Sequence, residues 1–169
     1  MLEFLILFIS PDIHKRRQMI ERLELPSNMH FIELESEIEI LPIISEEEVK
    51  LIILDKWLTS KGDESGICEF LMKNSSSSSV PLICLNESQK VLPGCTNIIS
   101  YLSSDPDPLE LRTEILKQYQ KYQDEYELHL ENNLIMSIVN RIHSPIFIID
   151  QNSISFANQY FLDFFALSS

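Results

Sequence analysis

The sequence predicts an α/β fold in which a parallel sheet is covered by helices on both faces. Two observations support this prediction. Strand-like apolar runs alternate with helical segments along residues 1–120. One run, Val49–Asp55, is almost wholly apolar and ends on a carboxylate, as is typical of a strand buried on both faces. Because open α/β folds place their sites at the carboxyl ends of the strands, Asp55 is the first candidate site residue.

The first strand is expected over residues 4–9, and a helix follows it. Ser10, Pro11 and Asp12 supply an N-cap, a proline at the first helical position and an acid in the first turn. This helix should run to about Leu23. Its early basic residues are expected to be mostly solvated: His14, Lys15, Arg16 and Arg17.

The next elements complete the alternation of strands and helices. A short strand is expected over residues 29–34, and residues 36–44 are a weak helix candidate that Pro42 ends early. Between residues 86 and 97 there is room for a short helix at most, because Pro93 and Gly94 stop it. The other predicted elements are one helix and two strands, in chain order residues 66–73, 80–85 and 98–102.

A long helix is expected from Leu109 to about Val139, since no proline or glycine interrupts it. A heptad-like stripe follows this helix: Leu116, Tyr119, Gln123, Tyr126, Leu130 and Asn133. The stripe favours a two-stranded coiled coil. A single amphipathic helix that packs on its own domain is the alternative. The predicted division of the chain is a domain over residues 1–118, a helical linker over 109–139 and a second, partial domain over 140–169.

Composition and net charge limit the classes of binding partner that can be expected. With 13 basic and 26 acidic residues the formal charge is −13, which repels phosphate backbones and anionic membranes. No nucleic acid and no membrane partner is therefore expected. Three cysteines without C-x-x-C spacing, Cys68, Cys84 and Cys95, favour reduced thiols in a cytoplasmic protein. The apolar amino-terminal stretch is too short for a membrane span and lacks the basic start of a signal peptide.

Three segments support a resemblance to a known family. They are Leu51–Leu58 with the following Gly66, then Val80–Leu85, then Tyr101-Leu102 with Asp107-Pro108 at the start of the last helix. Through them, residues 1 to about 120 resemble the receiver domain of bacterial response regulators. The resemblance implies a flavodoxin-like strand order of 2-1-3-4-5 and places Asp55 at the phosphoacceptor position. It also implies Mg²⁺ as the cofactor of phosphoryl transfer.

The sequence departs from the family at several positions around Asp55. The family's acidic pair after the first strand is replaced by Ser10 and its neighbours, and Asp12, the nearest acid, is expected to stabilise the helix N-terminus. Asp12 and Asp55 stay as weak candidate Mg²⁺ ligands. Asn86 stands where the family has a Ser or Thr, and Ser104 stands where it has a lysine.

These departures favour a degenerate receiver, or pseudo-receiver, that acts by protein contact. The alternative is a phosphorylatable receiver that uses Asp55 and Mg²⁺, with a histidine kinase or another phosphodonor as partner. An enzyme is not expected, because no glycine-rich phosphate loop and no G-x-S-x-G motif is present. A phosphotransfer role for His129 or His143 is not favoured, since neither has the acidic and Arg/Pro context of a kinase phosphoacceptor.

Residues from about 134 to 167 are similar to the beginning of a PAS domain. An apolar hairpin over residues 145–156 and the aromatic segment after it, Asn158–Leu167, support that likeness. It covers roughly the amino-terminal third of the fold. A receiver, a coil and a PAS segment together resemble the front end of multidomain sensors with a histidine kinase or diguanylate cyclase output. The expected assembly is a homodimer through the long helix and the PAS segment.

Overall fold

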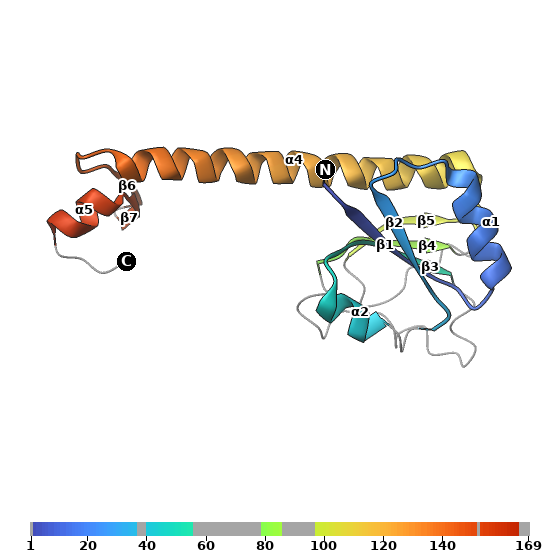
Figure 1. Cartoon of the computed structure of the whole chain (residues 1–169). Coiled ribbons are helices and arrows are strands. Elements are labelled where there is room, and N and C mark those ends of the chain that lie inside the picture. Colours follow the sequence, from blue (N-terminus) through green and yellow to red (C-terminus); the bar gives the residue numbers. More distant parts are fainter. Residues whose placement is uncertain (1, 37–39, 56–78, 86–96, 152, 166–169) are drawn as a thin grey trace. The chain divides into compact units, whose positions relative to one another are not determined.

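The computed structural model describes residues 2–36, 40–55, 79–85, 97–151 and 153–165. The first part of the chain forms a five-stranded parallel sheet with helices on both faces (Figure 1). The strand order is β2-β1-β3-β4-β5, which confirms the predicted flavodoxin-like fold. The strands are β1 Phe4–Ile9, β2 Met29–Leu34, β3 Val49–Asp55, β4 Leu82–Leu85 and β5 Ile98–Leu102.

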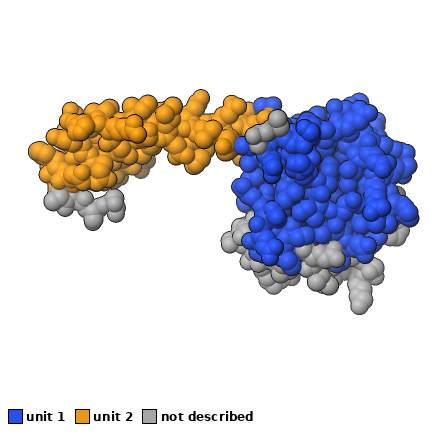
Figure 2. Space-filling model, viewed as in Figure 1, with its two compact units in different colours: residues 1–122 blue, residues 123–169 orange. Residues whose placement is uncertain are grey.

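Two compact units make up the chain, residues 1–122 and residues 123–169 (Figure 2). The first contains the sheet, α1 (Ile13–Leu23), α2 (Ile40–Glu46) and the beginning of α4 (Pro108–Arg141). The second contains the rest of α4, an antiparallel hairpin of β6 (Phe147–Asp150) and β7 (Ser153–Ala157), and α5 (Gln159–Phe164). The predicted hairpin followed by a helix is therefore confirmed.

The sheet carries an apolar core on each face. Successive residues of a strand point to opposite faces, so Phe4, Ile6 and Phe8 pack with Met19 and Leu23 of α1 and with the start of α4. Their alternates in β1 pack with α2 on the other face (Figure 1). In β3 the same alternation leaves Leu51 to Asp55 buried on both sides, as the apolar run predicted.

The start of α1 differs from the prediction. Asp12, not Ser10, is the N-cap, because its Oδ1 accepts the backbone N–H groups of His14 and Lys15 at 2.9 and 3.1 Å. Ser10 stays with the sheet, where its N–H donates to the Leu34 carbonyl at the end of β2. The helix begins one residue after Asp12 and ends at Leu23 as expected.

The helix α2 continues past Pro42, so the expectation that this proline ends it early is wrong. Because α2 begins at Ile40, Pro42 lies in the first helical turn, where the backbone N–H groups have no partner within the helix. The missing donor therefore costs no helical hydrogen bond. Ile43 and Ile44 are then free to pack against the core on this face of the sheet.

The long helix is confirmed from Pro108 to Arg141, and its beginning belongs to the first unit. Leu116, Tyr119 and Tyr122 pack against the core under α1. The Tyr119 ring meets the Phe4 ring edge-on at 5.4 Å, and the Tyr119 hydroxyl lies 2.5 Å from Asn28 Nδ2, which donates to it. The first positions of the heptad-like stripe thus face their own domain, and exposed stripe residues begin only beyond Tyr122.

Asn158 joins the three elements of the second unit. Its Nδ2 donates to three carbonyls at and beyond the end of α4, and its Oδ1 accepts the N–H groups of Ile146 and Phe161 at 3.0 Å. The three carbonyls belong to Val139, Ile142 and Ser144. One fully buried side chain therefore satisfies both the end of α4 and the start of α5.

Several predicted segments lie outside the described residues, namely residues 59–65, 66–73 and 86–96, together with Cys68 and Cys95. Within the described parts of the chain, no helix combines the length and the apolar character that crossing a membrane requires.

Candidate functional site at the carboxyl edge of the sheet

Asp55 is the last residue of β3 and is buried, with 1% of its surface exposed. It pairs with Leu85, the last residue of β4, so it lies at the carboxyl edge of the sheet. Parallel strands end at this edge together, and the turns after them meet there. The position that the apolar run predicted for Asp55 is therefore the one that it occupies.

Ser10 follows β1 directly and reaches the same edge. Its hydroxyl donates to Asp55 Oδ2 at 2.9 Å, and both residues are buried. Ser10 thus stands beside Asp55 at the place where the family resemblance leads one to look for an acid. A hydroxyl that donates to the carboxylate stabilises its charge, whereas a second carboxylate would oppose it.

Lys15 brings a cation to Asp55, which the sequence did not predict. Its Nζ lies 2.5 Å from Asp55 Oδ2, and the lysine side chain is 21% exposed. Because only Ser10, Pro11 and Asp12 separate α1 from β1, the first turn of α1 lies at the carboxyl edge, and the side chain of its third residue extends back to β3. This contradicts the expectation of a solvated Lys15. The spacing of five residues after Ser10, in the first turn of the helix, was the signal available in the sequence.

Arg16 is buried at 2% exposure, which also contradicts the expectation of a solvated side chain. Its guanidinium donates to the Ser10 carbonyl and, from Nε at 3.2 Å, to Glu33 Oε2 near the end of β2. A buried guanidinium needs such partners for its donors. Arg16 therefore fixes the backbone of the residue whose hydroxyl contacts Asp55.

The second carboxylate oxygen of Asp55, Oδ1, is buried as well. Among the residues that the structure describes, no hydrogen-bond donor reaches it. Among the described residues, the Asp55 carboxylate accepts two side-chain hydrogen bonds, from Ser10 and Lys15, and both go to Oδ2. One oxygen of the carboxylate is thus committed to two donors, one of them charged.

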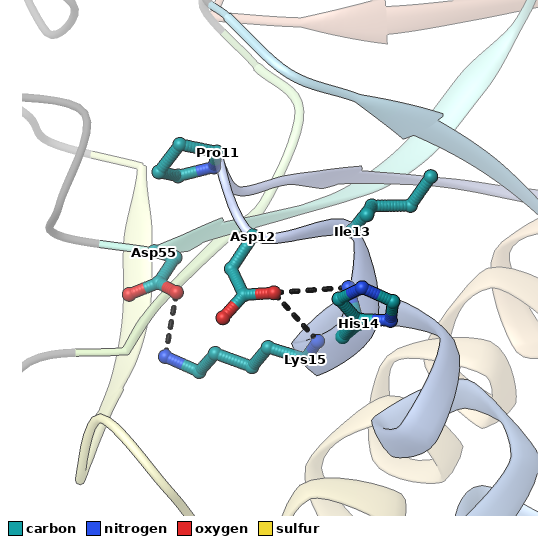
Figure 3. Close-up of a pocket in the computed structure, with 6 residues that line it drawn as sticks. All are labelled: Pro11, Asp12, Ile13, His14, Lys15 and Asp55. Carbon is teal, nitrogen blue, oxygen red and sulfur yellow. Dashed lines mark hydrogen bonds and ion pairs between the residues drawn. The ribbon is translucent and has the colours of Figure 1, made fainter.

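Asp12 lies at the rim of the same site and is exposed. The pKa of its carboxyl is lowered, chiefly because the Lys15 backbone N–H donates to it; the His14 N–H and the charges of His14 and Lys15 act in the same direction. Its expected role at the helix N-terminus is the one that the capping geometry shows. Asp12 and Asp55, the two candidate metal ligands, line one open pocket of about 590 Å³ together with Lys15 (Figure 3).

The remaining predicted residues are Asn86 and Ser104. Asn86 lies outside the described residues. Ser104 lies in the bend between β5 and α4 and is half-buried. The cation at Asp55 thus comes from α1, which follows the first strand, and not from the end of β5.

Mg²⁺, which the receiver resemblance implies, does not find the set of oxygen ligands that it needs among the residues that the structure describes. Mg²⁺ requires near-octahedral oxygen ligation at about 2.1 Å. Asp55 Oδ2 already has the Lys15 ammonium at 2.5 Å and the Ser10 hydroxyl at 2.9 Å, and one oxygen of Asp12 caps α1. Within the described residues, no group of three or more His, Cys, Asp or Glu side chains is arranged to hold a metal ion.

Sequence comparisons give no match, either to a protein-family model or to a curated protein. Solved structures do match. A signal receiver domain of an HD domain-containing protein from Pseudomonas fluorescens Pf-5 is 17% identical, with a TM-score of 0.60 over 75% of this chain and 94% of that chain.

Two further structures have similar values. A response regulator receiver modulated diguanylate cyclase from Pelobacter carbinolicus is 25% identical, with a TM-score of 0.58 over 73% of this chain and 97% of that chain. A CheY-like response regulator receiver domain protein from Methanospirillum hungatei JF-1 is 16% identical, with a TM-score of 0.60 over 73% and 98%. The first unit of this chain therefore has the fold of response-regulator receiver domains.

Proposed function

We propose that this chain is a regulatory module of a signalling protein, in which a pseudo-receiver acts by protein contact and not by phosphorylation of Asp55. The observation that supports this most strongly is the ion pair of Lys15 with Asp55, at 2.5 Å and beside the Ser10 hydroxyl. The receiver domains with which the fold compares provide the regulatory context.

The chemistry of phosphoryl transfer explains why this ion pair matters. In receivers the acceptor carboxylate attacks phosphorus while a divalent cation neutralises the charge that develops. Here Asp55 Oδ2 is held by two donors, and the position after β1 offers a serine hydroxyl instead of an acidic pair. An added phosphoryl group would also bring negative charge to a chain of net charge −13.

The alternative function is a phosphorylatable receiver that uses Asp55 and Mg²⁺. Lys15 is the observation that favours it, because a lysine ammonium near the acceptor could balance the charge of a phosphoryl group. In that case Lys15 would have to leave Asp55 Oδ2 and move to the new phosphoryl oxygens.

Phosphorylation with a small donor separates the two functions. Wild type and Asp55→Ala are incubated with acetyl phosphate and Mg²⁺ and then measured by intact mass, with a receiver of known activity as positive control. The expected result is the unchanged mass for both proteins. A stoichiometric gain of one phosphoryl group in the wild type, absent from Asp55→Ala, would establish the alternative.

We also propose that the second unit forms a homodimer through α4. The residues of α4 beyond Tyr122 expose many large apolar side chains, among them Leu128, Leu130, Leu134, Ile135 and Ile138. In the described part of the second unit only Asn158 and Phe161 are buried, so this surface needs cover. A second copy of the helix, alongside in parallel, provides the same exposed apolar side chains, and two-stranded coils bury such side chains between their helices.

Light scattering at micromolar concentration tests the dimer. The full chain is expected to be dimeric, and a truncation after Tyr122, which keeps the packing of Tyr119 on Phe4, is expected to be monomeric. Leu134→Glu should weaken the dimer, whereas Glu131→Gln should leave it intact. A full chain that is monomeric under these conditions contradicts the proposal.

The proposed partners follow from this arrangement. The module has no catalytic activity of its own, and the hairpin with α5 is the beginning of a PAS domain that receives or transmits the signal along α4. Structures with the same receiver fold carry names that link them to an HD domain and to a diguanylate cyclase. An output domain of that kind, or a histidine kinase, is the proposed partner.

A further inference from the structure

The site around Asp55 contains a cation of its own. The Lys15 ammonium lies 2.5 Å from Oδ2 of a carboxylate that is 1% exposed, while the lysine side chain itself is 21% exposed. Figure 3 shows the Lys15 side chain extended past Asp12, with Nζ at Asp55. A buried carboxylate must be paired or neutralised, and Lys15 supplies the charge that does so.

The oxygen atoms around this ammonium are of the kind that a hard divalent cation prefers. They belong to the carboxylates of Asp55 and Asp12, which line one pocket, and to the Ser10 hydroxyl bonded to Asp55. A divalent ion at Asp55 Oδ2 would stand directly beside Nζ. Two cations at one carboxylate oxygen repel each other, so the ammonium opposes the binding of a metal ion at Asp55 Oδ2.

We propose that the Lys15 ammonium takes the place of the divalent cation at Asp55, so that the wild-type site excludes the metal and removal of the ammonium opens it. The inference rests on the proposed function, since it names what makes the pseudo-receiver independent of Mg²⁺. It assigns Lys15 as the residue that decides the cation specificity of this site.

The probe is Mn²⁺ alone. The electron paramagnetic resonance signal of the free ion is measured, and its loss reports binding directly. Lys15→Met keeps the length and apolar stem of lysine but removes the charge. Its affinity for Mn²⁺ is expected to be at least about tenfold higher than that of the wild type, because the repelling charge is gone. Mn²⁺ should also raise the unfolding temperature of Lys15→Met and leave that of the wild type unchanged.

Two controls connect the effect to this pair. Arg17→Met removes one charge from an exposed position two residues further along α1, so it should bind Mn²⁺ as weakly as the wild type. In the double variant Lys15→Met/Asp55→Asn the acceptor carboxylate is gone, and the gain in affinity should disappear. Wild-type affinity in Lys15→Met, or an equal gain in the double variant or in Arg17→Met, overturns the inference.

A Lys15→Met protein that fails to fold still tests the inference, since the missing charge would then be the cause. Asp55→Asn should restore folding in the double variant, because a neutral amide needs no cation, and Mn²⁺ present during refolding should rescue the single variant. Failure of both rescues overturns the inference. Failure of the proposed function is a separate result, because the intact-mass experiment would then detect a phosphoryl group on the wild-type protein, whatever the Mn²⁺ affinity of Lys15→Met.

Discussion

Ser10 and Asp55 lie 45 residues apart in the sequence and share a buried hydrogen bond of 2.9 Å at the carboxyl edge of the sheet. The strands β1 and β3 are neighbours in the sheet, and the bond connects the residue after β1 with the last residue of β3. Lys15 donates to the same oxygen. The site is thus a small network in which each donor has a measurable effect.

The Ser10 hydroxyl is expected to stabilise the fold through Asp55. Ser10→Ala removes a donor from a buried carboxylate oxygen, so the free energy of unfolding should fall by about 1–3 kcal/mol. Urea denaturation measures this loss. Ser103→Ala, at an exposed serine after β5, is the matched control and should change stability by less than about 0.5 kcal/mol. Equal effects of the two substitutions would contradict the role of Ser10.

The Arg16 guanidinium is expected to matter far more than that of its neighbour. Arg16→Met leaves the buried Ser10 carbonyl without this donor and removes the bond to Glu33, so unfolding should become easier by about 1–3 kcal/mol. Arg17→Met removes the same group from an exposed position and should fall within about 0.5 kcal/mol of the wild type. A similar urea midpoint for both variants would show that Arg16 does not hold this edge.

Asn158 is expected to hold the hairpin and α5 to the end of α4. Asn158→Ala removes the acceptor for the Ile146 and Phe161 amides, so their hydrogen exchange should accelerate by about tenfold or more. Exchange measured residue by residue by NMR checks this, with the amides of β1 and β3 as internal reference. Asn132→Ala, at an exposed position of α4, should leave these rates unchanged. Unchanged exchange in Asn158→Ala would contradict the joining role.

The Cys84 thiol is expected to make stability depend on alkaline pH. Burial raises its pKa from 9.0 to about 12, so the folded protein keeps a proton that the unfolded chain loses. The contribution is complete below the unfolded pKa of 9.0 and declines as pH rises above it towards the folded value. The free energy of unfolding should therefore fall more steeply above about pH 9 in the wild type than in Cys84→Ala. Parallel curves for the two proteins would argue against a protonated buried thiol.

The success of the fold prediction has a local cause. Apolar runs such as Val49–Asp55 and the breaks between them are properties of neighbouring residues, and α/β alternation then allows few topologies. The prediction erred where position within an element decided the outcome. Pro42 is tolerated because α2 starts only two residues before it. Asp12, and not Ser10, caps α1 because its carboxylate accepts two backbone N–H groups.

By itself, the sequence determined the parallel sheet, the position of Asp55 at the end of a buried strand and the length of α4. Each depends on residues that are neighbours in the chain: alternating apolar and helical segments, an apolar run that ends on a carboxylate, and a long stretch without proline or glycine. Only the tertiary structure decided what surrounds Asp55. The sequence predicted solvated side chains for Lys15 and Arg16. The direction of α1 after β1 instead places the Lys15 ammonium at Asp55 and buries the Arg16 guanidinium against the Ser10 carbonyl. Tyr119 belongs to the heptad-like stripe but packs against Phe4 of its own domain. This contact depends on where the sheet lies and not on the spacing of apolar residues along the helix.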